Sequence, residues 1–186
     1  KRWADEGRLP CSKTPGGHRR FRKIDIEKIL AEERGEMGDQ QLDHWIRLAR
    51  DAGSAEFEAE LLLARVREGS WFKVAEMLGK VITEIGLLWS RGELSIIQEH
   101  RASERIRRAL ANISERMVVS GGMKAVLVAA PQERHTLGLS LVEIVLREAG
   151  FETIWLGTRV PASEFDALLV STKIALIAAS ASVASA

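Results

Sequence analysis

The sequence predicts a multidomain protein in which an all-α part precedes an α/β part. No proline occurs between Pro15 and Pro131, and apolar residues recur at helical spacing through much of that stretch. After Ser120, short apolar runs alternate with amphipathic segments, as in a parallel sheet with crossover helices. At 186 residues the chain can hold two or three small domains. We expect these domains at 1–34, 39–119 and 123–186.

The composition is that of a folded cytoplasmic protein. Apolar residues make up 46% and charged residues 28% of the chain, which argues against disorder. Cys11 is the single cysteine, so an internal disulfide is excluded, as is common in a reducing cytoplasm. No apolar run approaches the roughly 18 residues of a membrane span, so we expect no membrane partner.

Charge is distributed unevenly along the chain. Residues 1–23 contain eight Lys or Arg and two acidic residues, a net charge of +6, whereas the remainder carries −5. A basic end on an otherwise acidic protein is typical of a module that binds a polyanion. A solvated basic terminus is the alternative.

The basic end has the pattern of a helix, a hairpin and a second helix. Residues 14–17, Thr-Pro-Gly-Gly, predict a turn, and residues 18–23 alternate basic side chains with Phe21 as a short strand does. Asp25 can cap the helix that follows. Arginines on such a hairpin can contact DNA phosphates or a minor groove.

The run R-W-A-D-E-G-R-L-P followed by T-P-G-G-H-R-R-F resembles the recognition helix and wing of MerR-type winged-helix regulators. The resemblance implies part of a winged helix-turn-helix domain, without its first helix, and operator DNA as the partner. Trp3 and Phe21 would then form the small core of this domain. The implied DNA-binding residues are Arg2, Lys13, His18, Arg19, Arg20 and Arg22.

The middle of the chain predicts a four-helix bundle. Apolar positions from Phe72 to Trp89 fall at helical spacing, with Ser70 as a cap and Gly92 as a stop. Ser95, with Gln98 three residues later, forms a capping box that begins another helix. Helices joined by short loops pack as an antiparallel bundle.

Residues 123–186 predict part of a Rossmann-like domain with a doubly wound parallel sheet. Its expected strands are Lys124–Ala130, Glu152–Leu156 and Ile174–Ala179. An amphipathic helix over 136–149 and a helix opened by Pro161 would connect them. A G-x-G-x-x-G motif is absent, so we expect no ordinary dinucleotide site.

The first strand is followed by E-x-H-x-x-G, with Glu133, His135 and Gly138 at the fixed positions. An exposed imidazole can bind a metal through one nitrogen, while a nearby acid accepts a hydrogen bond from the other. Glycine lets the backbone pass close to a bulky group. A solvated loop histidine is the alternative.

This motif is similar to the D-x-H-x-x-G signature of cobalamin-binding domains, with Glu133 in place of the usual aspartate. The resemblance implies that His135 binds cobalt from below. It also implies that Ser180 and Ser182, in an S-x-S pattern after the third strand, contact the nucleotide tail, and that Gly157 adjoins the cofactor. A hydrogen-bonded pair at the strand end is the alternative for the serines.

Trp89 is separated by nine residues from the pair Glu99 and His100. This W-x9-E-H arrangement resembles the cap of CarH-like photoreceptor regulators, which implies a tryptophan over the upper face of cobalamin and an acid–imidazole pair near its upper axial group. Light-sensing members carry a histidine directly after the tryptophan, whereas this chain has Ser90. The usual bis-histidine adduct is therefore not expected, and His100 is the alternative ligand. Without the resemblance, Trp89 would be assigned to the core and the pair to the surface.

Together these patterns predict a cobalamin-responsive, DNA-binding transcriptional regulator rather than an enzyme. The resemblance favours a repressor, adenosylcobalamin as the cofactor, a homo-oligomer (dimer or tetramer) and possible light sensitivity. The alternatives are a cobalamin-carrier module of a methyltransferase-type enzyme and a regulator that has lost its cofactor.

Overall fold

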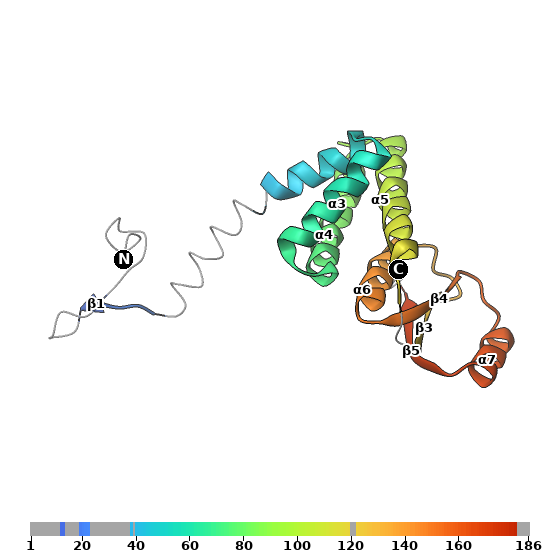
Figure 1. Cartoon of the computed structure of the whole chain (residues 1–186). Coiled ribbons are helices and arrows are strands. Elements are labelled where there is room, and N and C mark those ends of the chain that lie inside the picture. Colours follow the sequence, from blue (N-terminus) through green and yellow to red (C-terminus); the bar gives the residue numbers. More distant parts are fainter. Residues whose placement is uncertain (1–11, 14–18, 23–37, 39, 120–121, 182–186) are drawn as a thin grey trace. The chain divides into compact units, whose positions relative to one another are not determined.

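The structure, a computed structural model, describes residues 12–13, 19–22, 38, 40–119 and 122–181 (Figure 1). The chain divides into two compact units, Lys1–His44 and Trp45–Ala186. Within the described ranges, every helix is too short or too polar to cross a membrane.

The first unit contains the predicted hairpin. Strands β1 (Ser12–Lys13) and β2 (Arg19–Arg20) pair antiparallel, with Ser12 opposite Arg20 and Lys13 opposite Arg19. Arg22 follows the second strand and is exposed. The predicted turn at 14–17 and both flanking helices lie outside the described residues, as do Arg2 and His18. The winged helix therefore remains a prediction.

The helical bundle occupies the first part of the second unit. A helix over 40–51 leads into it, followed by α3 (Ser54–Glu68), α4 (Trp71–Ser90) and α5 (Ile96–Arg116) (Figure 1). The predicted caps are present at two of these helices. Ser70 Oγ accepts from the backbone of Lys73 at 3.4 Å, and Ser95 forms a capping box with Gln98. The expectation of a bundle is confirmed.

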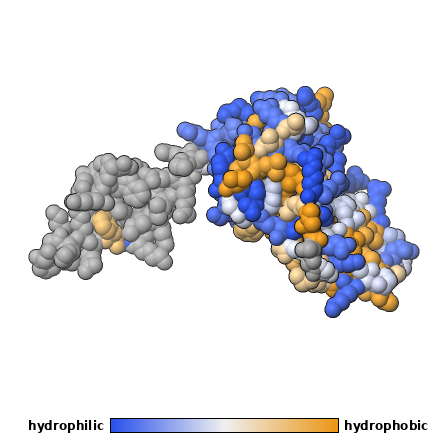
Figure 2. Space-filling model, viewed as in Figure 1, coloured by the Kyte–Doolittle hydropathy of each residue, from blue (hydrophilic) through white to orange (hydrophobic). Residues whose placement is uncertain are grey.

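Each bundle helix contributes fully buried side chains to one core. Trp45 and Phe57 meet edge to face, with ring centroids 5.8 Å apart. Aliphatic residues at helical spacing are also fully buried, including Leu78 and Ile85 of α4 and Ile106 of α5. Figure 2 shows that apolar side chains also reach the bundle surface among the charged ones.

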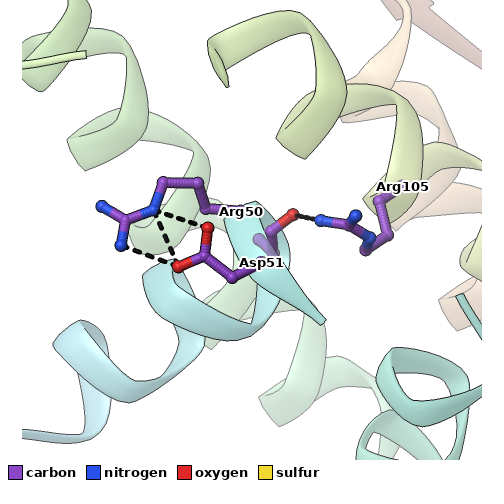
Figure 3. A network of polar contacts seen from close by, with 4 residues as sticks. Arg50, Asp51 and Arg105 are labelled. Carbon is purple, nitrogen blue, oxygen red and sulfur yellow. Dashed lines mark hydrogen bonds and ion pairs between the residues drawn. The ribbon is translucent and has the colours of Figure 1, made fainter. Parts of the chain in front are cut away.

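Arg105 of α5 ties the end of the 40–51 helix to the bundle (Figure 3). Its Nη1 donates to the carbonyl oxygen of Ala49, which lies in the last turn, where helix carbonyls lack intrahelical partners. Beside it, Arg50 donates to both carboxylate oxygens of Asp51. This hydrogen bonding, together with the charge of Arg50, lowers the pKa of Asp51 below its usual value.

The sheet contains β3 (Met123–Ala129), β4 (Phe151–Gly157) and β5 (Ile174–Ser180), all parallel, in the order β4-β3-β5 (Figure 1). Helix α6 (Leu137–Glu148) connects β3 to β4. Helix α7 (Ala162–Ser171) begins directly after Pro161 and precedes β5. The predicted strand-helix alternation and the parallel sheet are confirmed.

Helix α6 lies between the sheet and the bundle. Its sheet-facing side joins Leu139 to a cluster with Leu127 and Ala129 of β3. On its other side, the carboxylate of Glu148 accepts from Arg65 Nε at 2.6 Å and from the backbone of Trp71 at 2.8 Å. Helix α6 therefore contacts both the sheet and the bundle. These contacts fix the position of the preceding loop relative to the bundle.

Candidate functional site

His135 lies on the loop between β3 and α6, residues 130–136, at the carboxyl edge of the parallel sheet. We call this segment the histidine loop. Ligands of such sheets bind in the crevice at this edge. The side chain of His135 is 87% exposed, whereas that of Glu133 is 3% exposed. The loop therefore buries its acid and presents its imidazole.

Glu133 holds the loop through one carboxylate oxygen. Its Oε1 accepts from the backbone nitrogens of Arg134 at 2.8 Å and His135 at 2.6 Å, and contacts His135 Nδ1 at 2.7 Å. Because a carboxylate only accepts, the proton of a neutral imidazole lies on Nδ1. The lone pair of Nε2 is then available to a metal.

Ser180 ties the same loop to the end of β5. Its Oγ donates to the carbonyl oxygen of His135 at 3.1 Å, and its own carbonyl accepts from the backbone of Ala130 at 2.8 Å. In this arrangement Ser180 supports the loop that carries His135. Ser182 lies outside the described residues.

A groove of about 700 Å³ separates the histidine loop from α5. Gly138 lies on its loop side, and a Cβ atom added there would meet nothing within 4 Å. The groove is lined by Ile82 of α4, by Glu99, His100, Arg101, Ser103, Glu104 and Arg107 of α5, and by residues 134–138.

The α5 wall carries a second acid–imidazole pair. Glu99 Oε2 contacts His100 Nδ1, and Glu99 Oε1 accepts from Ser103 Oγ at 2.7 Å. The side chain of His100 is 72% exposed. The groove thus has one carboxylate-paired histidine on α5 and another on the loop.

Charged pairs along α5 set the electrostatics of this wall. Glu104 accepts from Arg107 and from Arg108, each at a closest distance of 2.7 Å. These hydrogen bonds, from Arg107 first, lower the pKa of Glu104 from 4.5 to about 2. Its carboxylate therefore stays ionised, and Arg107 contributes a compensated positive charge to the groove.

Four of the predicted cofactor residues that the structure describes are not among the groove lining, namely Trp89, Glu133, Gly157 and Ser180. Trp89 lies near the end of α4 and is 48% exposed, which excludes the core alternative. Gly157 ends β4 with a φ of 68°. Ser90, next to the tryptophan, donates from Oγ to the carbonyl of Leu87 at 2.8 Å.

Several lining residues were not predicted from the sequence, notably Ile82, Ser103 and Arg107. The signal that could have found two of them is spacing. Glu99, Ser103 and Arg107 follow one another at four-residue intervals and so share a face of α5. Ile82 comes from another helix, and no local pattern links it to the motif.

The described residues contain no group of three or more His, Cys, Asp or Glu placed to hold a metal ion. A bare ion bound only by protein commonly needs about four ligands. A single oriented imidazole instead suits a metal that brings most of its ligands with it.

The helical bundle matches a known protein family. Residues 56–114 match the family described as a B12 binding domain. An 89-residue stretch is 32% identical to the HTH-type transcriptional repressor CarH of Myxococcus xanthus, covering 48% of this chain and 30% of that relative. The chain thus aligns with less than a third of the relative's length.

Among solved structures, a cobalamin-binding protein from Desulfitobacterium hafniense DCB-2 has a TM-score of 0.36 and 16% identity, covering 77% of this chain and 69% of that one. Independently of that likeness, the helices that match a B12 binding domain precede a parallel sheet whose carboxyl edge presents His135.

Proposed function

We propose that this chain is a cobalamin-responsive, DNA-binding transcriptional regulator in which His135 is the lower axial ligand of cobalt. His135 carries the proposal, because its imidazole is exposed on the groove with Nδ1 held by a buried carboxylate. The match of residues 56–114 to a B12 binding domain supports cobalamin as the ligand. The proposal assigns no catalytic step to the chain.

The residues present fit this cofactor. Cobalamin supplies a cobalt ion whose equatorial ligands come from the corrin ring, so one imidazole from the protein suffices below it. Glu133 fixes the ring of His135, and the open space above Gly138 leaves room for the macrocycle. Glu99 and His100 would face it from α5, whereas Trp89 would have to approach from the end of α4.

The DNA-binding part of the proposal rests on the basic first 23 residues and the hairpin they contain. The match to a transcriptional repressor supports repression at an operator. Cofactor binding can alter DNA occupancy only if it favours one assembly or conformation over another. We propose a homo-oligomer whose assembly responds to adenosylcobalamin, and to light through that cofactor.

The cofactor proposal is tested by mixing the chain with adenosylcobalamin in the dark, desalting it, and recording the visible spectrum. We expect retained cofactor and a base-off spectrum with imidazole below cobalt. His135→Ala should weaken binding by more than about tenfold. His44→Ala is the matched control, because His44 is exposed and is not among the groove residues. Loss of the cofactor on desalting of the unmodified chain would refute the proposal.

The DNA proposal is tested by fluorescence anisotropy with a duplex of about three helical turns. Replacing Arg19 and Arg20 together by glutamine should weaken binding and reduce the slope of log K against log salt by about 2. Unchanged affinity and slope would remove the hairpin from the DNA interface. Gel filtration of the cofactor-loaded chain before and after illumination tests assembly and light sensitivity together.

A further inference from the structure

A second hollow lies beside the groove, between α5, the start of α6 and β4. Its volume is about 520 Å³, and sites for small ligands typically have volumes of about 300–1,000 Å³. It shares Arg107 and Thr136 with the groove. Its other lining residues are Ala111 and Glu115 of α5, Ser140 and Glu143 of α6, and Trp155 of β4. We call this hollow the tryptophan compartment, and the cobalt ligation proposed above uses none of these five side chains.

Glu143 is held by a chain of hydrogen bonds that runs through β4. Arg147 Nη2 donates to the carbonyl oxygen of Met117 at 3.1 Å, and its Nη1 donates to Thr153 Oγ1 at 3.0 Å. Because a guanidinium only donates, Thr153 accepts from Arg147 and donates its own proton to Glu143 Oε1 at 2.9 Å. Glu143 Oε2 forms no hydrogen bond within the described part of the chain. One oxygen of this carboxylate is therefore fixed and the other is available.

Ser140 supplies a buried hydroxyl to the same compartment. The residue lines the compartment although it is only 4% exposed, and its Oγ forms no hydrogen bond with the residues that the structure describes. A buried hydroxyl without a partner is unfavourable, and a bound group that hydrogen-bonds to it offsets this cost. This position therefore indicates a ligand independently of the charges around it.

The compartment carries more acidic than basic side chains. The carboxylate of Glu115 forms no ion pair or hydrogen bond with the described residues, and Glu143 keeps one oxygen available. Among the described lining residues, Arg107 is the basic one, and its Nε and Nη2 already donate to the carboxylate of Glu104, at 2.8 and 2.7 Å. Arg147 is not a lining residue. A cleft with a surplus of one sign of charge attracts ligands of the opposite sign.

Trp155 gives the compartment an aromatic wall. It is 40% exposed on β4, so part of the indole is open to a ligand. Among aromatic side chains, tryptophan attracts a cation most strongly, when the charge lies within about 6 Å of the ring. An indole beside two carboxylates and a hydroxyl is thus suited to a positively charged group with an apolar body.

We propose that the tryptophan compartment binds a small organic cation, namely a protonated amine attached to an aromatic or aliphatic body. The ammonium group donates to Glu143 Oε2 and Ser140 Oγ, and the body packs against Trp155. Glu115 adds attraction from α5. Binding is non-covalent, goes beyond the function proposed above and does not depend on cobalamin.

Three probes of similar shape and different charge test the proposal, namely protonated benzylamine, benzyl alcohol and benzoate. The full chain, labelled with ¹⁵N, is titrated with each probe at neutral pH while nuclear magnetic resonance follows the indole N–H signals. The chain has five tryptophans, and Trp155→Phe identifies the signal of Trp155 by its loss. We expect benzylamine to shift this signal saturably, benzyl alcohol to bind about tenfold more weakly or worse, and benzoate not to bind.

Glu143→Gln should weaken benzylamine binding by about tenfold or more, because it removes the charge but keeps an acceptor for Thr153. Ser140→Ala should weaken binding by about threefold to tenfold, as expected for the loss of one hydrogen bond. Glu93→Gln is the matched control, since Glu93 is exposed and does not line the compartment. Unchanged positions of the remaining indole signals show that each variant keeps its fold.

The titration contains no cofactor, so its outcome is independent of whether the chain binds cobalamin. If benzylamine leaves the Trp155 signal in place, the compartment does not bind an organic cation of this kind, and the proposal fails. If benzyl alcohol binds as tightly as benzylamine, or if Glu143→Gln leaves benzylamine binding unchanged, the compartment does not recognise the positive charge and the proposal is overturned.

Discussion

Oε1 of Glu133 lies 2.6 Å from the backbone nitrogen of His135 and 2.7 Å from its ring Nδ1. One buried oxygen therefore fixes both the backbone and the ring of the same residue. A side chain that holds a ligand in this way acts on the metal without touching it, because it sets the tautomer and raises the basicity of the other nitrogen.

Glu133→Gln should weaken cobalamin binding by about 10- to 100-fold, the range found when such supporting partners are replaced. The amide can still accept a hydrogen bond, but it carries no charge to increase the basicity of the imidazole. Equilibrium dialysis with hydroxocobalamin measures the change. Glu164→Gln on α7, which is exposed, is the control, and equal affinity in both variants would contradict the role given to Glu133.

Glu148→Ala should lower the free energy of unfolding by about 1–3 kcal/mol. The substitution removes the partner of Arg65 Nε and the acceptor for the backbone of Trp71, both half-buried contacts between the bundle and α6. Urea unfolding followed by circular dichroism gives the value. Glu76→Ala, at an exposed position of α4, is the control and should change stability by less than about 0.5 kcal/mol.

The fold was largely predictable because its elements depend on local signals. Ser70, Ser95 and Pro161 mark helix starts, and the apolar run in β3 marks a buried strand. Each of these signals acts within a few residues, so the chain needs no distant contact to express it.

The groove was only partly predictable, because its walls come from segments far apart in sequence. The E-x-H-x-x-G motif gave His135 and Glu133, whose contact is local. That Ile82 and Arg107 would line the same groove depends on how α6 packs between bundle and sheet. The exposure of Trp89 likewise depends on tertiary packing, since helical spacing alone assigns it to the core.

Ser114→Ala should leave stability unchanged or raise it by up to about 1 kcal/mol. Ser114 is 1% exposed on α5, and its Oγ has no hydrogen-bond partner among the described residues, so the hydroxyl is buried at a cost. Alanine also has the higher helix propensity. Thermal unfolding checks this, with Ile106→Ala as a contrast that should cost about 2–5 kcal/mol. A large loss in Ser114→Ala would show that the hydroxyl has a partner after all.

Glu104 should contribute stability that depends on pH at the acidic end. Its pKa is lowered from 4.5 to about 2 by the hydrogen bonds from Arg107 and Arg108, so the folded state favours the ionised carboxylate. The contribution is complete above pH 4.5 and is lost as the pH falls toward 2. Because the side chain is 43% exposed, solvent and salt keep the effect below about 1 kcal/mol. The ¹³C carboxyl shift of Glu104 should titrate with a midpoint below the ordinary value of 4.5, and the stability difference between the unmodified chain and Glu104→Gln should shrink over the same range. A midpoint at the ordinary value of 4.5 would show that the two arginines do not hold this carboxylate in solution.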